Sequence, residues 1–234
     1  MKLLYVDVPF AHIAGGDTNR SSFIWSELNQ RFDADLLLIK TEAYRTKPVP
    51  EHEGYQNLYT IASNAPSIFH AQAIHSFHPN QLRKYRDILT NGKYDIFVFR
   101  FLSTFQLASI AAEVLPHASI AIDVDMLFSR IAELSWSREK RLKNRYHLIE
   151  MMKLKEFEAT AFSKPFHFFF TNILERDMAR ANYGLSESRA YVFPNMMPEY
   201  PTQAHKSRNE SYILFFGTLN SIANTDAVDY LMQD

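Results

Sequence analysis

Short apolar runs recur along the whole chain, and the stretches between most of them have the composition and spacing of amphipathic helices. Runs that are nearly free of charge are typical of strands buried on both faces of a sheet. Strands that alternate with helices predict a parallel sheet covered on both faces through right-handed crossovers. The expected fold class is therefore α/β with a doubly wound parallel sheet. The expected strands are Leu3–Val8, Asp35–Lys40, Leu58–Ala62, Tyr94–Phe101, Ala118–Asp123, Phe166–Thr171 and Tyr191–Phe193.

Composition narrows the class of protein. The chain has 234 residues, 47% of them hydrophobic, and a formal net charge of −1, which disfavours a general role in coating nucleic acid. It contains no cysteine, which excludes a disulfide scaffold, thiolate metal sites and cysteine nucleophiles. The first residues, MKLLYVDVPF, carry one lysine and an apolar run broken by Asp7, which is more typical of a buried strand than of a signal peptide. We therefore expect a cytoplasmic protein without a nucleic-acid partner.

The character of the chain changes near residue 195. All the strands named above lie in residues 1–195, which we expect to form one domain. Residues 196–211 are mostly polar and lack periodicity, so we expect a linker there. Residues 212–234 open with the apolar run YILFFG and continue as a helical tail, the first strand and helix of an incomplete second α/β domain. One strand and one helix cannot bury both of their faces, so we expect a truncation at Asp234 and self-association through this end.

The loop after the first strand is the first candidate binding site. Open parallel sheets bind ligands beyond the carboxyl ends of their strands, and a helix N-terminus at that edge favours anions. The loop and the start of the next helix contain His12, Gly15, Gly16 and Asn19. Their spacing is neither GxGxxG nor GxxxxGK[ST], which disfavours a dehydrogenase and excludes a P-loop NTPase. A plain tight turn is the alternative interpretation of the two glycines.

Charged residues end two further expected strands at the same edge. Asp123 and Asp125 close the run ASIAIDVD, and Arg100 closes YDIFVFR. Two carboxylates suit Mg²⁺ or Mn²⁺, but this short pattern also occurs by chance and fits helix capping, so we expect no bound metal. We place both aspartates in the active cleft. A charge on an apolar strand is costly unless it is paired or reaches the mouth of the cleft, and both interpretations stay open for Arg100.

The segment Arg138–Glu158 is basic and amphipathic. It holds seven Lys or Arg residues against four Glu, with Leu142, Tyr146, Ile149 and Leu154 at helical spacing. Two interpretations stay open: the solvated face of a long covering helix, or a peripheral contact with anionic lipid.

Six segments, taken in chain order, carry a family resemblance: IAGGDTNRSSFIWSEL, YDIFVFRF, IDVDMLFSRIAELSW, FHFFFTNILERDMA, VFPNMMP and ILFFGTLNSIANTDAVDYLM. They resemble segments of GT-B glycosyltransferases, in particular bacterial family-4-like sugar transferases. The first segment resembles their glycine loop and first helix, the third their aspartate-rich segment, and the last the entry to their second Rossmann domain. Met196 stands where the family commonly has the glycine of a Pro-Asn-Gly turn.

This resemblance implies that residues 1–195 are the Rossmann-like, acceptor-side domain of a GT-B fold whose second domain is truncated. It implies transfer of a sugar from a nucleotide diphosphate sugar to an acceptor such as a glycan or lipid-linked saccharide, with retention and without a metal or other cofactor. Because the donor needs the missing domain, this chain alone is expected to be inactive. The alternative is a non-catalytic Rossmann-like binding module, associated with the inner face of a membrane.

The resemblance also implies roles for individual residues. Asp123 and Asp125 are expected to be catalytic, by orienting an acceptor hydroxyl or stabilising a developing positive charge. The expected substrate-binding residues are His12, Gly15, Gly16, Asn19, Arg100, Asn195, Gly217 and Thr218.

Overall fold

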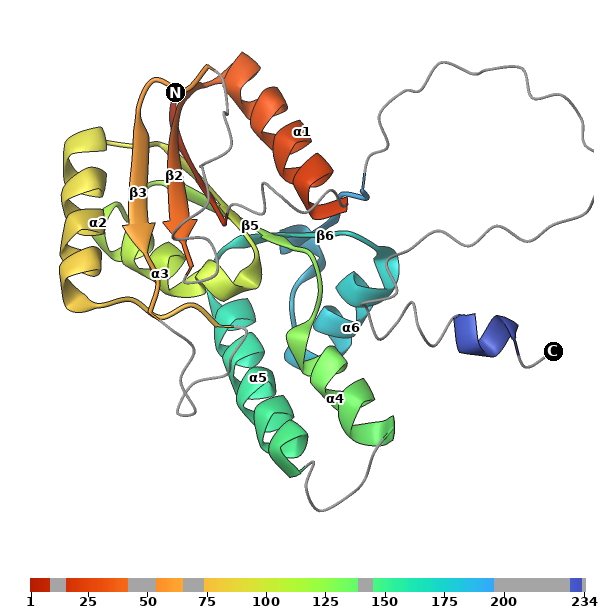
Figure 1. The fold of residues 1–234 in the computed structure, drawn as a ribbon. Helices are drawn as coiled ribbons and strands as arrows, with labels where there is room; N and C mark the ends of the chain where they lie inside the picture. Colours follow the sequence, from red (N-terminus) through yellow and green to blue (C-terminus); the bar gives the residue numbers. More distant parts are fainter. Residues whose placement is uncertain (9–15, 42–53, 65–73, 139–144, 196–227, 233–234) are drawn as a thin grey trace, which may run out of the picture. The chain divides into compact units, whose positions relative to one another are not determined.

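The computed structural model describes residues 1–8, 16–41, 54–64, 74–138, 145–195 and 228–232. The chain divides into two compact units, Met1–Met197 and Pro198–Asp234, and each is described by itself. The first unit is built on a seven-stranded parallel sheet with helices between the strands (Figure 1). In the second unit, residues 228–231 form one helical turn, and the expected strand after the linker lies outside the described residues.

The sheet confirms the predicted α/β class. Its strand order is β3-β2-β1-β4-β5-β6-β7, and every neighbouring pair is parallel. The order of the strands reverses between β1 and β4, which is the switch point where doubly wound sheets bind ligands. The strands are β1 (Lys2–Asp7), β2 (Asp33–Lys40), β3 (Leu58–Ala62), β4 (Ile96–Arg100), β5 (Ser119–Val124), β6 (His167–Phe170) and β7 (Ala190–Val192).

Local signals set the ends of several helices. Asn172 caps α6 by accepting a hydrogen bond of 2.9 Å from the Glu175 amide, and Gly184 ends α6 with a φ of 67°. At the end of α2, Lys93 adopts the left-handed conformation with a φ of 51°, a position that favours glycine. The helices are α1 (Gly16–Arg31), α2 (Pro79–Gly92), α3 (Phe105–Val114), α4 (Phe128–Arg138), α5 (Arg145–Ser163) and α6 (Ile173–Tyr183). Two short 3₁₀ turns complete the unit, η2 (Leu102–Thr104) and η4 (Glu187–Arg189).

Side chains that alternate along each strand divide the core into two layers. On one face, Leu3, Tyr5 and Leu36 pack with Ile24 and Trp25 of α1. The larger layer lies on the other face, where α2, α3, α5 and α6 cover the sheet. Its aromatic side chains include Phe162 of α5, whose ring meets that of Phe168 edge-on at 4.9 Å between centroids. Many of the chain's 19 phenylalanines thus belong to the core.

Helices α4 and α5 pack against each other as an antiparallel hairpin (Figure 1). The buried Glu158 of α5 accepts hydrogen bonds from the Ser129 amide at 2.9 Å, the Ser129 hydroxyl at 2.5 Å and the Tyr183 hydroxyl at 2.6 Å. About one turn further along the pair, Nζ of Lys155 lies 3.4 Å from Oε1 of Glu133. Residues 126–162 contain neither glycine nor proline, a composition typical of helix, and the structure divides this stretch into two helices. None of the helices in the described part of the chain is long and apolar enough to cross a membrane.

Candidate functional site

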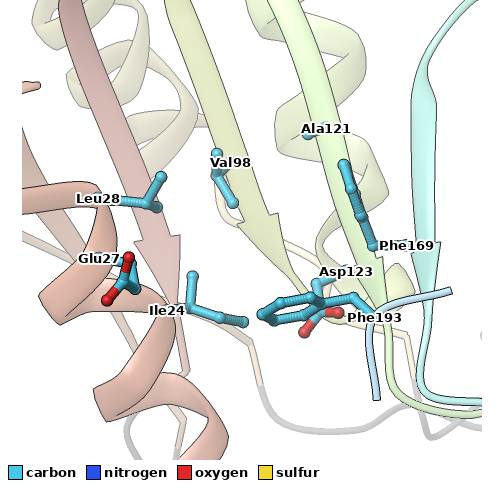
Figure 2. Close-up of a pocket in the computed structure, with 8 residues that line it drawn as sticks. All are labelled: Ile24, Glu27, Leu28, Val98, Ala121, Asp123, Phe169 and Phe193. Carbon is cyan, nitrogen blue, oxygen red and sulfur yellow. The ribbon is translucent and has the colours of Figure 1, made fainter. Parts of the chain in front are cut away.

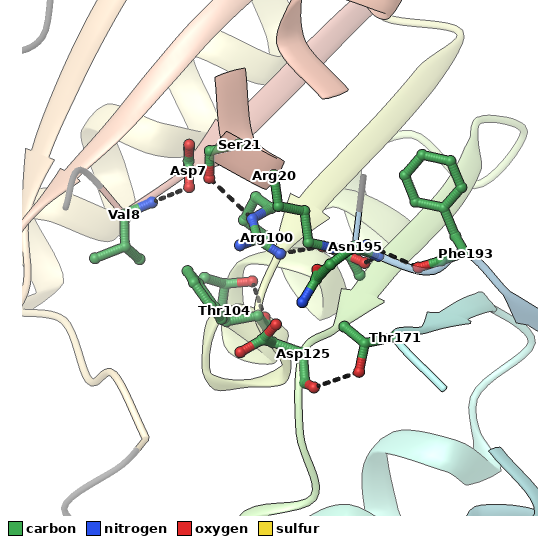
Figure 3. Close-up of polar contacts among 12 residues, drawn as sticks. Asp7, Val8, Arg20, Ser21, Arg100, Thr104, Asp125, Thr171, Phe193 and Asn195 are labelled. Carbon is green, nitrogen blue, oxygen red and sulfur yellow. Dashed lines mark hydrogen bonds and ion pairs between the residues drawn. The ribbon is translucent and has the colours of Figure 1, made fainter. Parts of the chain in front are cut away.

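A cluster of buried polar side chains lies at the switch point of the sheet (Figure 3). Asp7, Arg100 and Asp123 stand at or next to the carboxyl ends of β1, β4 and β5. Arg20 and Ser21, from the first turns of α1, reach the same place. Neighbouring parallel strands bring their last residues to one edge, which is why residues so distant in sequence meet here.

Asp123 is the centre of this cluster. Asp123 is 3% exposed, and its carboxylate accepts two hydrogen bonds from Arg20, from Nη2 to Oδ1 at 2.5 Å and from Nε to Oδ2 at 3.0 Å. Nη1 of Arg100 donates to the same Oδ2. Both arginines are almost fully buried, at 2% and 0% exposure. A carboxylate that neutralises two buried guanidinium groups acts first by holding them in place.

Arg20 links this cluster to the last residues of the sheet unit. Its Nη1 donates to the carbonyl oxygens of Phe193 at 2.7 Å and Pro194 at 3.1 Å, and to Oδ1 of Asn195 at 3.3 Å. The guanidinium also lies over the Phe193 ring, 4.8 Å from its centroid. One side chain therefore fixes the start of α1, the end of β5 and residues 193–195 relative to one another.

Asp7 and Arg100 make up the other half of the cluster. Burial raises the pKa of Asp7 to about 6, and the positive charge of Arg100 offsets only part of that rise. The Val8 amide donates to Asp7 at 2.7 Å, and Nε of Arg100 donates to the Ser21 hydroxyl at 3.0 Å. Nη2 of Arg100 is buried and has no hydrogen-bond partner in the part of the chain that the structure describes. Asp7 can therefore gain or lose a proton close to neutral pH beside a buried cation.

The loops around the cluster are fixed by side-chain-to-backbone bonds. The Thr171 hydroxyl, which follows β6, donates to the Asp125 carbonyl at 3.0 Å, and the Thr104 hydroxyl donates to the Phe101 carbonyl at 2.8 Å. Phe101 has a φ of 67°, an uncommon conformation for a bulky side chain, directly after the buried Arg100. The carboxyl edge is thus a set of constrained turns, as binding sites on open sheets require.

A pocket of about 220 Å³ lies beside the cluster on the α1 face of the sheet (Figure 2). Its walls are mostly apolar and come from α1, β4, β5 and β6, with Asp123 and Phe193 also lining it. Asp123 therefore belongs to both the ion-pair cluster and the pocket wall. The residues that line the pocket are Ile24, Glu27, Leu28, Val98, Ala121, Asp123, Phe169 and Phe193.

The structure brings three of the expected site residues together, because Arg100 contacts Asp123 and Asn195 is joined to Asp123 through Arg20. Asp125 lies at the same edge, half-buried, one residue beyond β5. Gly16 and Asn19 lie in the first turn of α1. His12, Gly15, Gly217 and Thr218 lie outside the described residues. For Arg100, the structure favours the paired interpretation, since its side chain is fully buried.

Sequence reasoning did not find Arg20, Ser21 and Asp7 as parts of this site. Asp7 was visible as the single charge in an otherwise apolar strand, which is a signal for a paired or functional carboxylate. Arg20 gave no such signal, because an arginine in a helix is ordinarily a solvated residue. Among the described residues, no three His, Asp or Glu side chains gather as a metal site would require.

The described fold is a Rossmann-like α/β domain, with helices on both faces of a parallel sheet and charged residues at its switch point. It is similar to sucrose-phosphate synthase from Thermosynechococcus elongatus, with a TM-score of 0.50 and 13% sequence identity over 82% of this chain and 47% of that one. No protein-family model and no curated protein matches the sequence.

Two other solved structures match with lower scores. One is UDP-GlcNAc 2-epimerase from Methanocaldococcus jannaschii, at a TM-score of 0.43 and 13% identity, covering 83% of this chain and 45% of that one. The other is Arabidopsis thaliana UGT89C1 complexed with UDP-L-rhamnose, at 0.39 and 12%, covering 86% of this chain and 53% of that one. The chain thus spans about half the length of each of these three structures. At this level of identity, the likeness concerns the fold.

Proposed function

We propose that this chain is the acceptor-side half of a GT-B glycosyltransferase that moves a sugar from a nucleotide diphosphate sugar to a glycan or lipid-linked saccharide. The observation that carries the proposal is the ion-paired cluster of Asp7, Arg20, Arg100 and Asp123 at the switch point of a Rossmann-like sheet. The fold likeness to sucrose-phosphate synthase, an enzyme of sugar metabolism by its name, supports it. Transfer with retention and without a metal follows from the resemblance noted in the sequence.

In this proposal, the cluster positions the groups that contact the sugar. Arg20 and Asp123 hold the N-terminus of α1, where the backbone amides favour an anionic group of the substrate. Asp125 and Asn195, which lie at the rim of the edge, are the proposed contacts to acceptor hydroxyls. Asp123 then acts as a positioning residue, because both of its oxygens bind arginines. His12, Gly15, Gly217 and Thr218 stay as proposed substrate contacts.

The proposal assigns the donor to a second domain. This chain spans about half the length of the similar structures described above, and the resemblance noted in the sequence assigns most of the contacts with the diphosphate to the second domain. The 234-residue chain is therefore expected to show no transferase activity by itself and to bind nucleotide sugars weakly.

Nuclear magnetic resonance on the ¹⁵N-labelled chain tests this function. We expect acceptor oligosaccharides to shift the amide signals of Ser21, Thr104 and Asp125, and to leave the amino edge of the sheet unchanged. Asp125→Asn should weaken this binding by about tenfold, on the scale of one hydrogen bond to a charged group, while Asp87→Asn on the exposed surface of α2 should not. An acceptor panel that shifts no signal at the carboxyl edge would refute the proposed site. Micromolar affinity for UDP- or GDP-sugars would refute the assignment of the donor to a second domain.

A non-catalytic binding module is the second candidate. The pocket beside Asp123 favours it, since this hollow is largely apolar and lies on the sheet face instead of at the rim where sugars would bind. Ligands that shift the signals of Leu28, Val98 and Phe169, without any effect at Asp125, would support this candidate over the transferase.

A further inference from the structure

The tip of the α4–α5 hairpin projects past the carboxyl edge of the sheet. The hydrogen bonds between Glu158 and Ser129 mark the level of this edge, because Ser129 lies in the first turn of α4, shortly after β5. A helix rises 1.5 Å per residue, so the part of α5 from Glu158 back to Arg145 extends about 20 Å beyond that contact. Figure 1 shows the free ends of both helices pointing away from the sheet.

Large apolar side chains are exposed along this projecting part. Ile149 is 53% exposed and Met152 is 62% exposed on α5, and Leu134 is 49% exposed near the end of α4. Tyr146, the second residue of α5, is 40% exposed. Single exposed apolar residues are ordinary on a protein surface. Several of them near the end of one projection indicate a surface that binds an apolar partner, such as another protein or a membrane.

The amino-acid sequence that joins α4 to α5 is rich in positive charge. Residues 138–145 read REKRLKNR, five basic residues and one acidic, in a chain whose formal net charge is −1. Arg145, which begins α5, is exposed. Basic residues next to exposed aliphatic and aromatic side chains form the chemical signature of a surface that binds anionic lipid headgroups while its apolar groups enter the interface.

We propose that the hairpin tip, defined by Leu134, Arg145, Tyr146, Ile149 and Met152, docks on an anionic lipid bilayer. The docking is peripheral and combines shallow insertion of the apolar side chains with attraction between the basic residues and the lipid headgroups. The carboxyl edge of the sheet, from which the hairpin projects, then faces the membrane. The inference does not depend on the proposed sugar transfer, since it concerns a surface outside the cluster at the switch point.

Cosedimentation with lipid vesicles tests this proposal on the full 234-residue chain. We expect binding to phosphatidylcholine vesicles that contain about 30% phosphatidylglycerol, and at least about tenfold weaker binding to phosphatidylcholine alone. Raising the salt from about 0.1 to about 0.5 M should release the protein, because screening removes the headgroup attraction. Ile149→Glu and Arg145→Glu should each weaken binding by about tenfold or more.

Two matched controls distinguish the tip from general charge effects. Leu58→Glu makes the same kind of change as Ile149→Glu, at a 38% exposed position on β3 near the amino edge of the sheet. Lys164→Glu reverses a charge just beyond the opposite end of α5 from Arg145. Both controls should bind vesicles like the unmodified chain, and circular dichroism should show all four variants folded.

No vesicle binding by the unmodified chain, or equal losses in tip and control variants, would overturn the proposal. A dimer in solution that Ile149→Glu converts to a monomer, without any lipid binding, would assign the tip to a second copy and overturn it too.

Discussion

Replacing Asp123 with asparagine should destabilise the sheet unit far more than an ordinary surface substitution. The change removes one negative charge from between the guanidinium groups of Arg20 and Arg100, two residues that are 2% and 0% exposed. It leaves Asp7 as the nearest remaining carboxylate of the cluster, and the new amide NH₂ would point a donor at arginine donors. Breaking a buried ion pair by removing one partner typically costs about 3–5 kcal/mol, and we expect a loss in that range.

Urea denaturation followed by circular dichroism at pH 7 measures this loss as a shift in midpoint at constant slope. Asp87→Asn, at an exposed position on α2, is the control and should change the free energy of unfolding by less than about 0.5 kcal/mol. A second variant that adds Arg20→Met to Asp123→Asn should recover part of the loss, because it removes one unpaired buried charge. A loss below about 1 kcal/mol for Asp123→Asn would show that water reaches the cluster, and would refute the buried ion-pair reasoning.

Three further predictions concern other buried or strained groups. The pKa of Asp7 is raised from 3.8 to about 6 in the folded chain, so the folded state holds this proton more tightly than the unfolded one. The contribution of Asp7 to the free energy of unfolding should therefore rise by up to about 3 kcal/mol as the pH falls from about 8 to about 4. Urea denaturation of the unmodified chain and of Asp7→Asn across this pH range measures this contribution as the difference between the two. The prediction is contradicted if the free energies of unfolding of the two proteins differ by the same amount at every pH. Glu158→Gln should cost about 2–3 kcal/mol, because it weakens charge-assisted bonds from Ser129 and Tyr183 in a fully buried site, and an unchanged melting temperature would argue against it. Lys93→Gly should stabilise the chain by about 0.5–1 kcal/mol, because glycine adopts the left-handed conformation at the end of α2 without strain; a lower melting temperature would count against this reasoning.

The strands and their class were predictable because their signal is local. A run such as DLLLIK or YDIFVFRF carries its burial pattern in adjacent residues, and the structure places strands within about two residues of the expected ends. The doubly wound arrangement followed from the alternation of such runs with helical segments, because right-handed crossovers leave few other topologies. The edge of the candidate site was predictable for the same reason, since Arg100 and Asp123 end buried strands.

The division of residues 126–162 into α4 and α5 was not predictable from composition, because neither proline nor glycine marks the break. Glu158 of α5 contacts Ser129 of α4 and Tyr183 of α6, and these contacts, between residues 29 and 25 positions apart, hold the two helices side by side. Packing between distant segments decides such a break, and helical propensity alone does not.

The sequence by itself determined that Asp123 stands at the carboxyl edge of a buried strand. Only the tertiary structure decided that its carboxylate is held by Arg20, 103 positions away, and by Arg100 of the neighbouring strand. The physical reason is that hydrophobic periodicity is a property of residues close together in the sequence. The partner of a buried charge depends instead on which strands and helices lie next to one another in the folded chain. A carboxylate at this edge would be solvated in an isolated strand, and it becomes the centre of an ion-pair cluster only when α1 packs over the switch point.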